Sequence, residues 1–187
     1  IVLVTLLILY IVYENHTRNK ELLKYAQTDA LTGLYNKETT EQLTDELLSE
    51  DENKSHAFLI LDVDCFKQIN DIYGHAVGDI VLQKFGKLLK GTFREGDILG
   101  RIGGDEFGVI MKNIQTKDIA MKKAEELLAK TQAYKIDELK GNNISISIGI
   151  STAPQDGDCY MDLYKRADQA LYQAKRSGKA RVCNYFS

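Results

Sequence analysis

A pair of glycines, Gly103-Gly104, divides the stretch RIGGDEFGVIM (101–111) between two apolar runs of strand length, 97–102 and 107–111. Adjacent glycines at such a position favour a tight hairpin, and a hairpin joins antiparallel neighbours. The other strand-length runs are separated by segments with helical spacing, which can carry the chain back across a sheet. This combination predicts an α/β fold of the α+β sandwich type, with helices packed on the faces of a mixed sheet.

Three further strands are predicted, at 57–64 (AFLILDVD), 143–152 (NISISIGIST) and 180–186 (ARVCNYF), so the central sheet has five. The second of these alternates isoleucines with small residues, which is typical of a half-buried strand. From residue 57 the predicted order is β-α-α-β-β-α-β-α-β. Five helices are predicted with these strands: one after residue 37, one over 66–73 up to Gly74, one over 79–92, one that follows Thr116 as its N-cap, and a last one that ends before Gly178.

The composition fits one domain with an additional segment at one end, because the chain has 187 residues and is 44% hydrophobic. A net charge of −3 argues against nucleic-acid binding and against a nuclease, which requires a basic surface. The cysteines Cys65, Cys159 and Cys183 are odd in number and share no CxxC spacing, which favours a reducing compartment without disulfides or zinc. We expect Cys65 to be a small apolar filler.

The chain begins with thirteen uncharged residues, IVLVTLLILYIVY, followed by a polar segment with Arg18, Lys20 and Lys24. Thirteen residues are fewer than the roughly 20 that a membrane span needs. Because basic residues follow, as on the cytoplasmic side of a span, we expect residues 1–13 to be the C-terminal part of a transmembrane helix. A buried strand or core helix is the alternative. Residues 14–28 are predicted to continue as a signalling helix or linker.

Carboxylates gather at two predicted strand ends. Asp62 and Asp64 are two residues apart and point to one side, while Asp105 and Glu106 lie at the hairpin. If the two strands are neighbours, these groups converge, and like charges so close raise each other's pKa unless a cation neutralises them. Oxygen ligands without His or Cys suit Mg²⁺ or Mn²⁺, and the glycines let a ligand approach the backbone. A solvated acidic turn explains the same residues without a metal.

Polar residues near the same strand suit a nucleotide. Asn70 can bind a base edge, and Asp79 can accept two hydrogen bonds from guanine, although Asp79 is equally suited to capping the predicted helix. Lys175 and Lys179 can bind phosphates, but cations are favoured at a helix C-terminus in any case. The sequence has no GxxxxGK[ST] loop, which excludes a P-loop nucleotidase.

Four ordered motifs resemble those of the GGDEF domain family, the diguanylate cyclases, over about residues 27–187. They are GGDEF (103–107), DALTGLYNK (29–37), DVDCFKQINDIYGHAVGD (62–79) and ADQALYQAKRSGK (167–179). The resemblance implies a cyclase-like palm fold for residues 29–187 that joins two GTP molecules into cyclic di-GMP and pyrophosphate. Lys37 and Lys179 stand where the family often has arginine, which keeps the charge but loses the bidentate fork.

The resemblance also implies roles for individual residues. Asp62, the Val63 carbonyl, Asp105 and Glu106 would hold Mg²⁺ or Mn²⁺, with Asp105 also accepting the 3′-hydroxyl proton. The implied substrate-binding residues are Asn70, Asp79 and His75 around guanine, and Phe66, Lys67, Gly103, Gly104, Lys175 and Lys179 on the phosphate side. Arg94 and Asp97 match the family's RxxD motif, through which cyclic di-GMP would inhibit the enzyme.

A product with two guanosines, made by chains with one guanine site each, requires a homodimer whose active sites face each other across a two-fold axis. The expected location is the bacterial inner membrane, with the globular domain in the cytoplasm. The rival hypotheses are a catalytically silent GGDEF domain that acts as a receptor for GTP or cyclic di-GMP, and a membrane-tethered dimerisation scaffold.

Overall fold

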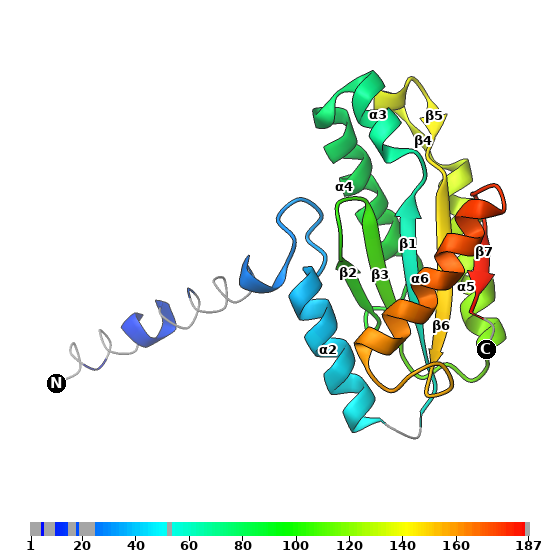
Figure 1. The fold of residues 1–187 in the computed structure, drawn as a ribbon. Helices are drawn as coiled ribbons and strands as arrows, with labels where there is room; N and C mark the ends of the chain where they lie inside the picture. The colour runs from blue at the N-terminus through cyan, green and yellow to red at the C-terminus, as the bar shows by residue number, and fades with distance from the viewer. Residues whose placement is uncertain (1–4, 6–9, 15–17, 19–24, 52–53, 186–187) are drawn as a thin grey trace.

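The computed structural model describes residues 5, 10–14, 18, 25–51 and 54–185. A five-stranded sheet in the order β2-β3-β1-β6-β7 forms its centre (Figure 1). The strands are β1 (His56–Val63), β2 (Ile98–Arg101), β3 (Glu106–Met111), β6 (Ile146–Ala153) and β7 (Val182–Asn184). The β6–β7 pair is parallel and the other neighbours are antiparallel, so the predicted five-stranded mixed sheet is confirmed.

Helices cover both faces of the sheet, α2 and α6 on one and α4 and α5 on the other (Figure 1). The bounds are α2 (Lys37–Glu50), α3 (Phe66–Tyr73), α4 (His75–Thr92), α5 (Lys117–Ala133) and α6 (Tyr160–Arg176). Because side chains alternate along β1, Leu59 and Leu61 join the α4–α5 core while Phe58 and Ile60 join the α2–α6 core. Two apolar layers therefore fix the sheet from either side.

The structure corrects the prediction of a half-buried strand at 143–152. All eight residues of β6 are buried, because its small side chains face helix α6 instead of solvent. Ser151 donates a hydrogen bond to the Leu163 carbonyl at 2.8 Å, and a Cβ at Gly149 would overlap main-chain atoms of Ala167 and Leu171. Small residues in this strand permit close packing of a helix.

Other differences from the sequence predictions are local. Helix α4 begins at His75 instead of residue 79, because Gly74 both ends α3 and precedes α4. Thr116 is the N-cap residue of α5, but its side chain makes no capping hydrogen bond. A short pair of strands, β4 (Lys135–Ile136) and β5 (Asn142–Asn143), with a 3₁₀ turn η1 (Asp137–Leu139) between them, was not predicted.

At the N-terminal end, Tyr10–Glu14 and Tyr25–Gln27 are helical and exposed. Most of the predicted transmembrane segment, residues 1–13, lies outside the described residues. Within the part of the chain that the structure describes, no helix is long and apolar enough to span a bilayer. The prediction of a membrane anchor therefore stays a prediction.

We expect Gly149→Ala to lower the free energy of unfolding by about 1–3 kcal/mol, because the new methyl group must displace the α6 backbone. Gly91→Ala is the matched control. Gly91 is an exposed residue of α4 with open space around its Cβ position, so this change should stabilise the protein by about 0.5–1 kcal/mol. Urea unfolding of both variants measures the difference, and equal effects would contradict the close packing of α6 on β6.

Candidate active site

The GGDEF stretch forms the turn between β2 and β3, beside the end of β1. Ile102 and Gly103 both donate main-chain N–H hydrogen bonds to the Glu106 carbonyl, at 3.0 and 3.2 Å. On the other side, the Val63 N–H donates to the Asp105 carbonyl at 3.2 Å, and Asp62 lies opposite Glu106 in the β1–β3 register. The two strands are therefore neighbours, as the convergence of their acids requires.

Gly103 and Gly104 have different surroundings in this turn. A Cβ at Gly103 would lie 2.8 Å from a carboxylate oxygen of Glu106, so the missing side chain leaves room for that carboxylate. Gly104 is exposed and has no atom within 4 Å of its Cβ position. The outer side of the turn is thus open to a ligand at the backbone.

Asp62 carries a buried charge in the middle of this group. It is 6% exposed, and its carboxylate forms an ion pair with Lys175 Nζ at 2.7 Å. Burial raises the pKa of Asp62 above its usual value; the Lys175 ammonium opposes this shift, and the Asp105 and Glu106 carboxylates add to it. Three acids therefore interact electrostatically, and the end of α6 supplies a compensating cation.

Asp64 does not join the three acids. Its carboxylate accepts hydrogen bonds from Ser145 Oγ at 2.6 Å, Ser147 Oγ at 2.8 Å and the Ala180 N–H at 3.2 Å. These bonds tie the end of β1 to β6 and to the segment before β7. Asp64 thus has a structural role, and the convergent group is Asp62, Asp105 and Glu106.

The guanine candidates meet where α3 and α4 pack. A Cβ at Gly78 would overlap the Asn70 carboxamide and lie 3.2 Å from the Phe66 ring, so both α3 side chains lie against Gly78. Asp79 follows Gly78 and is exposed in the second turn of α4. Because α4 starts four residues earlier, Asp79 is not its N-cap, which removes that alternative. His75 is exposed at the first position of the helix.

The phosphate-side candidates lie around the start of α3. Lys179 Nζ contacts Cys65 Sγ at 3.1 Å, and Lys67 is exposed in the first turn. Cys65 is exposed with φ of 59°, so the prediction of an apolar filler was wrong: the residue caps α3 in a left-handed conformation. Its thiol lies on the surface that Lys179 also occupies.

The RxxD loop precedes β2 and is held by hydrogen bonds of its own side chains, Arg94 and Asp97. Asp97, with a side chain 2% exposed, accepts hydrogen bonds from the N–H groups of Arg94 and Lys112, both at 3.1 Å. The Arg94 guanidinium is 64% exposed and donates to Asp97 at 3.3 Å and to the Lys112 carbonyl at 2.6 Å. Arg94 is therefore accessible, while Asp97 is occupied within the loop.

Sequence reasoning missed Arg101, which contacts both Asp29 and the GGDEF turn. Its position directly before Ile102-Gly103 was the available signal. Its partner Asp29 is 72 residues away in the chain, so the pair could not be derived from local spacing.

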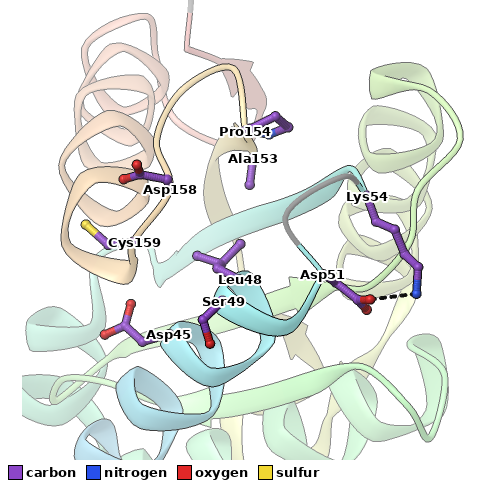
Figure 2. A pocket seen from close by; sticks show the side chains of 9 residues that line it. All are labelled: Asp45, Leu48, Ser49, Asp51, Lys54, Ala153, Pro154, Asp158 and Cys159. Atoms are coloured by element: carbon purple, nitrogen blue, oxygen red, sulfur yellow. Dashed lines mark ion pairs between the residues drawn. The ribbon is translucent and has the colours of Figure 1, made fainter.

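A cavity lies at the other end of the sheet, and Figure 2 shows the side chains that line it. Among the described residues, Asp158, Cys159 and Asp162 form a trio whose ligand atoms lie within 4.8 Å of one another. Asp158 and Cys159 line a cavity of about 550 Å³, together with Asp45 and Leu48 of α2. Ala153 of the lining pairs with His56, six residues along β1 from Asp62, or about 20 Å away. This cavity is not part of the candidate active site.

Comparison with known proteins agrees with this geometry. Residues 26–181 match the family model described as diguanylate cyclase, GGDEF domain. Diguanylate cyclase A of Treponema denticola is 37% identical over 170 residues, which cover 88% of this chain and 46% of that protein. The response regulator PleD of Caulobacter vibrioides is also 37% identical, over 91% of this chain and 39% of its own length. The chain spans about half the length of the curated relatives it matches.

Solved structures share the fold. The GGDEF domain of TpbB from Pseudomonas aeruginosa superposes with a TM-score of 0.80 at 33% identity, covering 85% of this chain and 94% of that one. The matched region contains the turn, the α3–α4 corner and the end of α6, in the order that the sequence motifs predicted. The chain therefore belongs to the GGDEF domain family of diguanylate cyclases.

Proposed function

We propose that this protein is a diguanylate cyclase that condenses two GTP molecules into cyclic di-GMP and releases pyrophosphate. The observation that carries the proposal is the β1–β3 register, which sets Asp62 opposite Glu106 and beside Asp105. The Asn70–Asp79 corner follows directly from the end of β1, through α3. Relatives named diguanylate cyclases support the same activity.

The all-oxygen donor set of Asp62, the Val63 carbonyl, Asp105 and Glu106 suits Mg²⁺ or Mn²⁺. The chemistry that such an ion supplies is neutralisation of phosphate charge and orientation of an in-line displacement at the α-phosphate. Asp105 accepts the proton of the attacking 3′-hydroxyl. Lys175 and Lys179, which contact Asp62 and Cys65 in this structure, bind the phosphates of GTP.

Guanine is selected at the α3–α4 corner. The exposed carboxylate of Asp79 accepts hydrogen bonds from the N1–H and 2-amino groups of guanine, and Asn70 binds another edge of the base. Phe66 lies beside Asn70, and His75 lies one helical turn before Asp79. Adenine lacks this pair of donors, so the corner favours GTP over ATP.

The active unit is a homodimer with two GTP-loaded sites facing each other across a two-fold axis, because the product contains two guanosines and each chain has one guanine corner. The helical residues before residue 28 are suited to bring two chains together, and residues 1–13 to anchor them in the inner membrane with the catalytic domain in the cytoplasm. Cyclic di-GMP binds at Arg94 and holds the two active sites apart. A structure of the DgcB GGDEF domain from Caulobacter crescentus in complex with cyclic di-GMP supports binding of this product within the family.

Asp62→Asn and Asp105→Asn should each lower kcat by at least about 1,000-fold, because one carboxylate of the phosphoryl-transfer site is lost. The assay is incubation with GTP and Mg²⁺, followed by mass spectrometry for cyclic di-GMP. Asp158→Asn, at the opposite end of the sheet, is the control and should retain full activity. Turnover that survives in both site variants would refute the assignment, and a wild-type chain that binds GTP without making product would instead favour a receptor.

Asp79→Ser should reduce the preference for GTP over ATP by up to about 10⁴-fold in kcat/KM, because the paired acceptor for guanine is removed. Competition between the two nucleotides in one reaction measures the ratio. Asp71→Ser removes another exposed acid of the same corner and should leave the ratio unchanged. If the Asp79 variant keeps its selectivity, guanine is recognised elsewhere.

Arg94→Ala should abolish inhibition by added cyclic di-GMP while the initial rate of GTP turnover remains, since the exposed guanidinium can clamp a phosphate or guanine edge. Glu95→Ala, in the same loop, is the control. Asp97→Ala should instead lower stability by about 1–3 kcal/mol, because two backbone N–H groups lose their buried acceptor. Unchanged inhibition curves for the Arg94 variant would show that the loop is structural.

A further inference from the structure

Arg101 joins two parts of the protein that are far apart in the sequence. Its Nη1 donates to both carboxylate oxygens of Asp29, at 3.1 and 3.3 Å. Its Nε and Nη2 donate to the Gly104 carbonyl, at 3.2 and 2.8 Å. The two side chains are only 16% and 22% exposed, so these charge-assisted bonds are partly shielded from water. One guanidinium thus holds the GGDEF turn and a residue before α2 at the same time.

The contact with Gly104 bears directly on Asp105. The Gly104 carbonyl belongs to the peptide group that precedes Asp105, while the Asp105 carbonyl, which accepts from the Val63 N–H at 3.2 Å, belongs to the one that follows. Both peptide planes around Asp105 are therefore fixed, one by β1 and the other by Arg101. Gly104 contributes no side chain to hold the turn, and its Cβ position has no neighbour within 4 Å. Without Arg101, the peptide before Asp105 loses this restraint.

Asp29 is in turn held within the loop that follows the N-terminal helical segment. Its carboxylate also accepts from the Thr32 N–H and Oγ1, at 2.8 and 2.7 Å. Burial alone would raise the pKa of Asp29, but the Thr32 hydrogen bonds and the charge of Arg101 outweigh it and hold the pKa below its usual value. The carboxylate is therefore ionised when it pairs with Arg101.

The segment 29–36 connects that helical end to the sheet edge. Asn36 bonds to the helical end twice: its N–H donates to the Gln27 carbonyl at 2.9 Å, and its side chain donates to the Ala26 carbonyl at 2.6 Å. Next to it, Tyr35 forms a parallel bridge with Gly100 of β2, and the segment lies along that edge in Figure 1. The Asp29 N–H donates to the Leu34 carbonyl at 2.8 Å in the same segment. Because Asp29 also closely follows residues 25–27 in the chain, a displacement of these residues reaches Asp29.

Resting on the proposed cyclase function, we propose that Arg101 is a positioning residue that couples the N-terminal helical segment to catalysis, by setting the peptide before Asp105 according to where Asp29 lies. The route runs along the chain from Gln27 to Asp29, in the segment that Asn36 and Leu34 hold by hydrogen bonds, and from Asp29 through Arg101 to Gly104. Arg101 contacts no residue of the guanine corner in this route. The coupling therefore acts on the rate of the chemical step and leaves guanine recognition at the α3–α4 corner unchanged.

If Arg101 only stabilised residues 29–36, other contacts that hold this segment should matter equally for catalysis. Lys90 offers the comparison, because its Nζ donates to the Gly33 carbonyl at 2.8 Å and so holds the same segment from α4. In this structure its described bond reaches the segment only, not the GGDEF turn. If loss of order in residues 29–36 were sufficient to impair catalysis, removal of the Lys90 contact would impair it as well.

The test uses the full 187-residue chain at protein concentrations where activity per chain has reached a plateau. The assay temperature lies below the unfolding midpoint of the least stable variant. Arg101→Met should lower kcat by about 100-fold, because misplacement of a catalytic group by about 1 Å has that effect. The KM for GTP should stay within about twofold. Arg101→Lys should not restore kcat, since one ammonium cannot serve Asp29 and Gly104 together. Lys90→Met should keep the wild-type kcat.

Asp29→Asn should lower kcat by about tenfold, because the charge that holds Arg101 is lost. The double variant with Arg101→Met should be no slower than Arg101→Met alone, because both changes break one route. A wild-type kcat in Arg101→Met, an equal loss in Lys90→Met, or additive losses in the double variant would each overturn the inference. A wild-type chain that makes no cyclic di-GMP would overturn the proposed function, and with it the coupling.

Discussion

The antiparallel register of β1 with β3 and β6 is the constraint on which the rest of the site depends. It places Asp62 opposite Glu106 on one side and Ser147 on the other. A slip of one residue would turn Asp62 to the opposite face and bring an apolar side chain to its place. All eight residues of β1 are buried, so such a slip would also disrupt both cores. The apolar layers thereby fix the position of a charged group that contributes nothing to their packing.

The position of the compensating cation follows from the packing of α6. Because Gly149 has no side chain, the backbone of α6 lies against β6 at Ala167 and Leu171. Lys175 is one helical turn beyond Leu171, which brings its Nζ to 2.7 Å from the Asp62 carboxylate. A larger residue at 149 would move the helix away and leave a buried acid without its partner, which is costly. The close packing of α6 in the middle of the sheet therefore determines the charge balance at the sheet's end.

What could be predicted from the sequence was local. Gly103-Gly104 between apolar runs predicted the hairpin, and strand-terminal acids predicted the group of Asp62, Asp105 and Glu106 but included Asp64, which is bonded to Ser145 and Ser147 instead. The full burial of β6 could not be predicted, because the pattern of isoleucines and small residues is the same whether water or a helix covers the small ones. The start of α4 was placed too late because Gly74 serves two helices. The pairing of Asp29 with Arg101 depends on how residues 29–36 return to the β2 edge, which no spacing encodes.

The site divides into two parts on either side of the end of β1. The GGDEF turn is bonded to β1 through Val63 and is held from the N-terminal side by Arg101, whereas Asn70 and Asp79 are positioned by helix packing at Gly78. The two parts follow one another in the chain through the short connection from Val63 to Phe66, and they also meet in the core, where the Phe107 ring packs edge-on against Phe85 of α4 with 4.9 Å between the ring centroids. Among the described residues, no hydrogen bond joins Arg101 or Asp29 to Asn70 or Asp79. Under the proposed function, a substitution at residue 79 would therefore alter which nucleotide is held, while movement of Asp29 would alter how Asp105 meets it. In a cyclase whose output follows the position of an N-terminal helix, this separation allows the rate to vary without loss of specificity for guanine.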